Sequence, residues 1–213
     1  MNYHEIVNDL NQIPNRKTKD VDRYNRKLIH QKEDVSSLKP YVLQDQLVHR
    51  TYFQVSLGKM KDYTEQFRFI EENEDFLQDW WHVDQLLQFM KRPIPFAYAF
   101  QKAKQYIQSS KPFVRRWGYV LFLLGFQKDP THTQDILSLL QNDDAYYVQM
   151  AEAWLICDLA VYHMEMVKQF LFTSKIQYNI LGRAIQKCCD SYRICQEDKE
   201  FLKSLREKLK NNE

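Results

Sequence analysis

"FLQDWWHVDQLLQF" (76–89), "FVRRWGYVLFLLGF" (113–126) and "MAEAWLICDLAVYH" (150–163) are three windows of the chain that align without a gap. Trp80, Trp117 and Trp154 hold the same place in each window and are 37 residues apart both times. Apolar residues line up around them: Phe76, Phe113 and Met150 before the tryptophans, and Val83, Val120 and Cys157 after them. Self-similarity at such a period is typical of a solenoid whose unit is a pair of helices. The sequence therefore predicts an all-α, HEAT-like helical-repeat solenoid, an α-α superhelix with a concave cleft.

The composition agrees with a helical class. The 213 residues include only 4 Gly and 6 Pro, with 44% hydrophobic and 27% charged residues, which favours a soluble helical protein over a β-sandwich or a disordered chain. The longest apolar run, "YVLFLLGF" (119–126), is too short to span a bilayer, and the amino terminus has no signal or transit pattern. We expect one α-helical repeat domain over residues 1–213, monomeric, cytoplasmic and without a membrane partner.

The distribution of charge and the positions of the cysteines and histidines bear on possible partners and metal sites. The net charge of +2 indicates no particular partner, but "RKTKDVDRYNRK" (16–27) holds six bases and two acids. Such a run is most often a solvated helix face, and contact with DNA stays open for it. Four cysteines without a CxxC pattern, and histidines without an HxxxH pair, predict no metal site. We therefore expect no cofactor.

Proline, glycine and short polar clusters divide the chain into segments with apolar residues at helical spacing. None of the segments has sustained two-residue alternation. Shorter helices between the windows, such as "HTQDILSLL" (132–140), supply the other half of each pair. The expected helices cover 17–33, 36–57, 61–73, 76–91, 95–109, 112–126, 132–141, 145–160, 163–172, 176–190 and 196–210.

Trp80 and Asp84 are one helical turn apart and therefore project from one strip of their helix. Trp154 and Asp158 repeat the arrangement two units later. A tryptophan at a repeated position is by default packed between repeats, but a buried, unpaired carboxylate costs several kcal/mol. Two interpretations follow: Asp84 lies at the wet end of its helix, or it faces a cleft.

The neighbours of this pair divide between core and surface. Trp81 projects about 100° away and is expected in the core, and His82 is expected to be a hydrogen-bonded structural histidine. Arg115 and Arg116 lie on the equivalent helix of the next unit and can pair with Asp84 or bind a phosphate. Aromatic faces, a carboxylate and arginines on one wall suit nucleic acid. The same surface also suits a peptide, and composition does not separate the two.

At these residues the sequence resembles the AlkD-like family of DNA alkylation repair glycosylases, which have HEAT-like repeats around a DNA-binding cleft. The resemblance covers roughly residues 45 to 210. It rests on "WWHVD" (80–84), "RRWGYVLFL" (115–123), "YVQMAEAW" (147–154) and "ILGRAIQK" (180–187), in that order. By this match, the catalytic residues are Trp80, Asp84, Arg116 and Trp154.

The resemblance implies a hydrolase that binds damaged duplex DNA and releases cationic N-alkylpurines such as 3-methyladenine or 7-methylguanine. An alkylated purine is already a cationic leaving group, so no general acid is required, and the sugar gains oxocarbenium character. Asp84 would stabilise that cation and hold the attacking water, with the two tryptophans packed on the sugar. Arg116 would hold a phosphate. Arg115, Arg183 and Lys187 would add DNA contacts.

The sequence departs from the family pattern at identifiable places. It has no recognisable opening helical segment with a lesion-covering aromatic residue, and Cys157 stands where the family tends to carry an arginine. Met150 and Glu152 replace residues that are usually basic. Fewer bases mean weaker, salt-sensitive DNA binding. Two alternatives to the glycosylase therefore stay open: a non-catalytic DNA-binding module of the same fold, and a protein-interaction scaffold.

Overall fold

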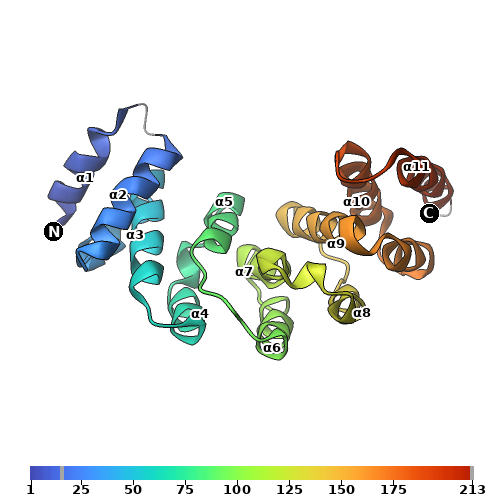
Figure 1. Cartoon of the computed structure of the whole chain (residues 1–213), viewed down its shortest axis with the longest axis horizontal. Helices are drawn as coiled ribbons and strands as arrows, with labels where there is room; N and C mark the ends of the chain where they lie inside the picture. Colours follow the sequence, from blue (N-terminus) through green and yellow to red (C-terminus); the bar gives the residue numbers. More distant parts are fainter. Residues whose placement is uncertain (15–16, 212–213) are drawn as a thin grey trace. The chain divides into compact units, whose positions relative to one another are not determined.

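The computed structural model describes residues 1–14 and 17–211, and these residues form helices and connecting turns, without a strand (Figure 1). The chain divides into two compact units, Met1–Ile94 and Pro95–Glu213. The all-α class is thereby confirmed. The single domain expected over residues 1–213 stays a prediction.

The first unit consists of short helices, three of which start at an aspartate. The carboxylates of Asp45, Asp62 and Asp79 accept backbone N–H groups at the starts of α3, α4 and α5, which satisfies donors that a helix start leaves unpaired. The unit contains α1 (Tyr3–Asn11), α2 (Thr18–His30), η2 (Ser36–Tyr41), α3 (Gln46–Lys59), α4 (Tyr63–Glu72), η3 (Glu74–Phe76), α5 (Trp80–Asp84) and η4 (Gln85–Gln88).

Helices α2 and α3 pack closely. Val21 and Leu28 of α2 and Phe53 of α3 are buried. At Gly58 the two helices approach so closely that a Cβ atom would lie 2.5 Å from Cδ1 of Ile29. Helices α2 and α3 therefore form one closely packed pair.

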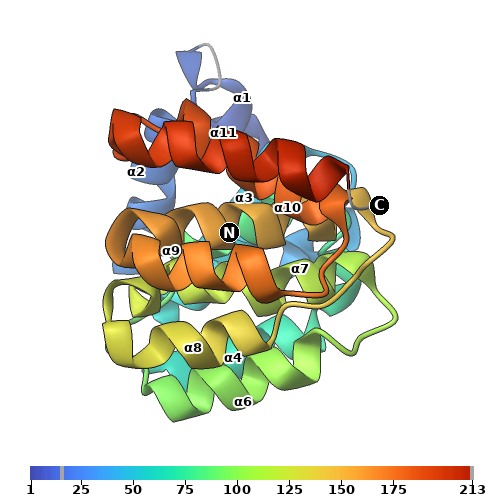
Figure 2. The same ribbon diagram turned by 90° about the vertical axis from the view of Figure 1, so that its right-hand side faces the viewer.

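The second unit is a series of helix pairs, seen in Figure 2, in which α10 lies beside α9 and α11 beside α10. Gly118 allows α7 to approach α6, because a Cβ atom there would lie 3.3 Å from the carbonyl oxygen of Ala103. The elements are α6 (Phe96–Tyr106), α7 (Pro112–Val120), η5 (Leu121–Leu124), η6 (Phe126–Lys128), α8 (Pro130–Ser138), α9 (Tyr146–Thr173), α10 (Tyr178–Asp190) and α11 (Gln196–Lys210).

The expected alternation of helices is confirmed, since α6 and α8 separate the three tryptophan-bearing helices α5, α7 and α9. Several boundaries differ from the expected ones. Helix α1 was not expected, and the helix expected over 36–57 is divided into η2, which contains Pro40, and α3, which Asp45 caps. The helices expected over 145–160 and 163–172 run together as α9, with non-helical backbone angles at His163.

No helix in the described part of the chain is long and apolar enough to cross a membrane.

Candidate functional site

The residues singled out from the sequence lie in both units, and each group is described within its own unit. The first unit carries Trp80 and Asp84. The second carries the remaining candidates, which are Arg115, Arg116, Trp154, Arg183 and Lys187.

Trp80 is the first residue of α5 and lies at the surface. The carboxylate of Asp79 accepts its backbone N–H at 2.6 Å, and 45% of the residue is exposed. Asp84, the last residue of α5, is half-buried. Trp80 is therefore not packed in a core, and an indole and a carboxylate one turn apart stand at the surface of the first unit.

The three aligned tryptophans differ in their surroundings. Trp117, in the middle of α7, is only 1% exposed, whereas Trp154 in α9 is half-buried. The sequence period thus identifies equivalent helices without fixing how far each indole is covered, because Trp80 starts a five-residue helix and Trp117 lies on the packed side of a longer one.

A buried polar network holds the turn that follows Asp84. The guanidinium of Arg50 in α3 donates to Oε1 of Gln85 at 3.3 Å and of Gln88 at 3.0 Å. The same guanidinium grips both carboxylate oxygens of Asp22 in α2, at 2.7 and 3.0 Å. Arg50 of α3, which is itself bound by Asp22 of α2, therefore holds η4 directly after Asp84.

Two stacked histidines, His49 of α3 and His82 of α5, connect these two helices. The rings of His49 and His82 lie 3.7 Å apart, nearly parallel. Nε2 of His49 is 3.0 Å from the carbonyl oxygen of Phe76, and its Nδ1 is 2.9 Å from the amide nitrogen of Gln85. The backbone N–H of Gln78 donates to Nδ1 of His82 at 3.1 Å. The hydrogen-bonded structural role expected for His82 agrees with this geometry.

Burial keeps both imidazoles neutral. It lowers the pKa of His49 to about 3 and the pKa of His82 to about 4. Since these values lie below that of an unfolded histidine, the stability of this cluster is fully present above about pH 6.5 and is lost as the pH falls toward 4 and 3. At neutral pH the cluster is an uncharged aromatic support, and Trp81 completes it with an edge contact to His49 at 5.1 Å.

In the second unit, both arginines of α7 have protein partners. Nε and Nη2 of Arg115 bind the two carboxylate oxygens of Asp143 at 2.6 and 3.0 Å, and this pairing raises the pKa of the Arg115 guanidinium. Arg116 is buried and donates from Nη1 to the carbonyl oxygen of Tyr147 at 2.6 Å. Arg115 therefore already has a carboxylate partner within its own unit, and Arg116 secures the start of α9.

Asp158 differs in environment from Asp84, although both follow a tryptophan by four residues. Asp158 is buried, paired with the guanidinium of Arg193, and accepts from Nε2 of Gln127 at 2.9 Å. Its charge is neutralised inside the unit. The acid of the second Trp-x-x-x-Asp pair thus has its partners within the second unit.

The start of α9 also presents exposed aromatic residues that the sequence reasoning did not single out. Tyr146 is 52% exposed, and the guanidinium carbon of Arg183 lies 4.9 Å from the centre of its ring. Tyr147 is exposed beside it, with ring centroids 5.2 Å apart. Lys187 follows Arg183 by one turn of α10 and is half-buried. The sequence analysis gives Arg183 and Lys187 as DNA contacts, whereas the only sequence signal for the two aromatic residues is the pair of tyrosines in "YYVQM" (146–150).

Glu152 illustrates how a departure in sequence is accommodated. It is fully buried in α9, and its Oε1 accepts the backbone N–H of Gln141 at 3.1 Å. Burial raises the pKa of this carboxyl to about 8. The carboxyl group of Glu152 therefore lies in the core and is not exposed where it could repel a DNA phosphate.

This raised pKa predicts a pH-dependent stability. Because the folded pKa lies above the unfolded value, the folded state binds the proton more tightly, and stability falls as the pH rises from about 4.5 to 8. Replacing Glu152 by Gln removes this penalty. At pH 8.5 we expect the free energy of unfolding of Glu152→Gln, measured with urea, to exceed that of the parent by about 2–5 kcal/mol. The difference is expected to vanish near pH 5. An equal difference at both pH values would contradict the assignment.

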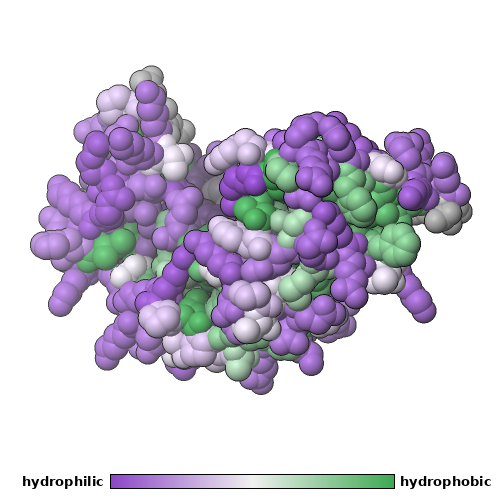
Figure 3. All heavy atoms as spheres, turned by 45° about the vertical axis from the view of Figure 1, so that its right-hand side comes forward, coloured by the Kyte–Doolittle hydropathy of each residue, from purple (hydrophilic) through white to green (hydrophobic). Residues whose placement is uncertain are grey.

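The face of the molecule drawn in Figure 3 is mostly hydrophilic, with hydrophobic residues in smaller areas between polar ones.

A family model described as DNA alkylation repair enzyme matches residues 16–185. This match spans most of the chain, and the protein belongs to the DNA alkylation repair enzyme family. No curated protein and no solved structure matches the chain. Family membership supports a role in DNA alkylation repair and in DNA binding.

Proposed function

We propose that this protein is an alkylpurine DNA glycosylase, which binds damaged duplex DNA and hydrolyses the N-glycosidic bond of cationic purines such as 3-methyladenine and 7-methylguanine. The observation that carries the proposal is the Trp80–Asp84 pair. Trp80 is 45% exposed, the carboxylate of Asp84 lies one turn away, and a buried network fixes the turn that follows Asp84. Preorganised charge of this kind is what stabilises a developing cation.

The reaction needs little from the protein beyond this charge. As the bond between C1′ and the purine nitrogen breaks, its electron pair passes to the purine and neutralises the ring. Positive charge grows on the sugar, where the carboxylate of Asp84 attracts it and the face of Trp80 adds a cation–π contribution. A water molecule held by Asp84 then forms the new bond to C1′ and releases its proton to the carboxylate.

DNA binding is proposed to involve the second unit. Arg183 and Lys187 lie one turn apart on α10, and the exposed ring of Tyr146 stacks with Arg183. Arginine and aromatic groups together suit a sugar-phosphate chain. Arg116 and Trp154 complete the proposed set, with Arg115 as a further contact. Because Arg115 is paired with Asp143, we expect it to contribute less to DNA affinity than Arg183.

The proposal is tested with methylated duplex DNA incubated with the full chain. Free methylated base is measured by chromatography, and binding of the same DNA is measured in parallel across salt concentrations. We expect release of methylated purines and no release of unmodified bases. Salt-sensitive binding without any release would replace the glycosylase by a non-catalytic DNA-binding module. Absence of binding even at low salt would leave the protein scaffold as the remaining function.

A further inference from the structure

Helix α2 carries a basic stripe that the proposed reaction does not use. The stripe consists of Lys19, Arg23, Arg26, Lys27 and His30, and every one of these residues is exposed. Their spacing of four, three, one and three residues places them on one face of the helix. The opposite face packs into the unit through Val21, Asn25 and Leu28.

The acidic residues of the same helix neutralise one member of this stripe, Arg23. Asp22 is bound by the buried Arg50 of α3, and Asp20 pairs with Arg23 at 2.8 Å. Among the described residues, no carboxylate pairs with Lys19, Arg26 or Lys27. Three cations on the outward face of α2 therefore have no acidic partner within residues 1–14 and 17–211.

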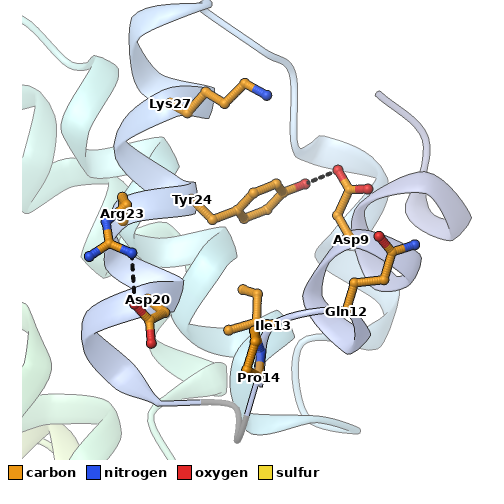
Figure 4. Close-up of a pocket in the computed structure, with 8 residues that line it drawn as sticks. All are labelled: Asp9, Gln12, Ile13, Pro14, Asp20, Arg23, Tyr24 and Lys27. Carbon is orange, nitrogen blue, oxygen red and sulfur yellow. Dashed lines mark hydrogen bonds and ion pairs between the residues drawn. The ribbon is translucent and has the colours of Figure 1, made fainter.

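The hollow beside the stripe does not explain these cations. A hollow of about 490 Å³ lies between α1 and α2, lined among others by Asp9, Asp20, Arg23 and Lys27 (Figure 4). Two acids and two bases balance there, and the hydroxyl of Tyr24 donates to Asp9 at 3.1 Å. An anion would meet the carboxylate of Asp9 in the hollow. A polyanion is better accommodated along the outer face of α2, where Asp20, the acid beside the stripe, is already paired with Arg23.

Hydrogen bonds of Arg50 connect the helix of the stripe to the candidate site. Asp22 lies between Lys19 and Arg26 on the helix, and its carboxylate is held by the guanidinium that also binds Gln85 and Gln88 behind Asp84. Asp22, beside the stripe, is therefore joined through one arginine to η4, the turn that directly follows Trp80 and Asp84. A polymer bound along the stripe is held by the same unit that presents the carboxylate.

We propose that the basic stripe of α2 binds the phosphate backbone of duplex DNA next to the lesion, which adds a contact surface to the proposed glycosylase and rests on that function. From Lys19 to His30 the stripe spans about 16 Å at the α-helical rise of 1.5 Å per residue. Duplex DNA presents several phosphates over this length. The contact is electrostatic and independent of sequence, so that unmodified and methylated DNA gain equally from it.

The test is the salt dependence of binding to unmodified duplex DNA. The variant Lys19→Gln/Arg26→Gln/Lys27→Gln removes three exposed charges and leaves the core untouched. Because each phosphate contact contributes about 0.9 to the slope of log K against log salt, we expect the slope to fall by about 2 to 3. The matched control is Lys203→Gln/Lys208→Gln/Lys210→Gln, which removes three exposed charges from α11 and is expected to change the slope by less than one.

The outcomes separate this inference from the proposed function. Equal changes of slope in both variants, or no change in the α2 variant, would overturn the assignment of the stripe, while base release by the parent chain would still support the glycosylase. Failure of the parent chain to bind DNA at any salt concentration would overturn both proposals.

Discussion

Asp84→Asn is expected to lower the rate of methylated-base release by about 100-fold to 1000-fold, the range for loss of one preorganised charge in an active site. The substitution keeps the size of the side chain and removes its negative charge. The cationic sugar therefore loses electrostatic stabilisation, while the packing around α5 stays the same. The measurement is single-turnover release of methylated purine with protein in excess, so that weaker binding does not limit the rate.

The control for this prediction lies in the same stretch of sequence. Asp79→Asn removes a charge five residues earlier, but asparagine caps a helix as well as aspartate does, and α5 keeps its start. We expect the Asp79 variant to release base within a few-fold of the parent rate. If both variants were equally slow, or both fully active, Asp84 would have no specific part in the chemistry.

Arg50→Met is expected to reduce the free energy of unfolding of the first unit by about 3–5 kcal/mol, because removing one partner of a buried ion pair leaves the other uncompensated. The Asp22 side chain is only 18% exposed, and Gln85 and Gln88 lose a donor at the same time. Methionine replaces most of the volume, so that a cavity contributes little. The measurement is urea unfolding, followed by base release from the folded variant, which we expect to fall because the turn behind Asp84 is no longer held.

An exposed ion pair on α2, the helix that carries Asp22, provides the comparison for this buried pair. The Arg23 side chain is 68% exposed and pairs with Asp20 one turn away, and such surface pairs contribute about 0–1 kcal/mol. Arg23→Met is accordingly expected to change stability little. In the double variant Asp22→Leu/Arg50→Met, the buried charge is absent altogether, and we expect part of the lost stability to return. Equal losses in Arg50→Met and Arg23→Met would show that the buried network does not support the unit.

The helix pairs could be predicted because their pattern is local. Apolar residues at helical spacing and the repeated windows indicate helices wherever they occur, and α6 and α8 lie between the marked helices as expected. Helix α1 was missed because only Ile6 and Leu10 of it are buried. Its start did carry a readable signal, since Asn2 and Glu5 form a capping box.

The candidate site was predictable only in part. Trp80 and Asp84 are four residues apart, and their placement on one strip follows from helical geometry alone. The bonds that hold them connect Arg50 to residues 28 positions earlier and 35 positions later in the chain, and no local pattern reports such contacts. Asp143 takes up Arg115 in the same way, from 28 residues away. Pairing across packed helices depends on the folded arrangement, which a single sequence does not reveal.

The most direct test of the central claim uses a duplex with one 7-methylguanine at a defined position. The full parent chain is added in excess, and abasic sites are detected by strand cleavage in alkali. We predict cleavage at the methylated position alone, at a rate well above that of spontaneous loss, with one free 7-methylguanine released for each abasic site. Binding of this duplex without any abasic site above the spontaneous background would contradict the glycosylase.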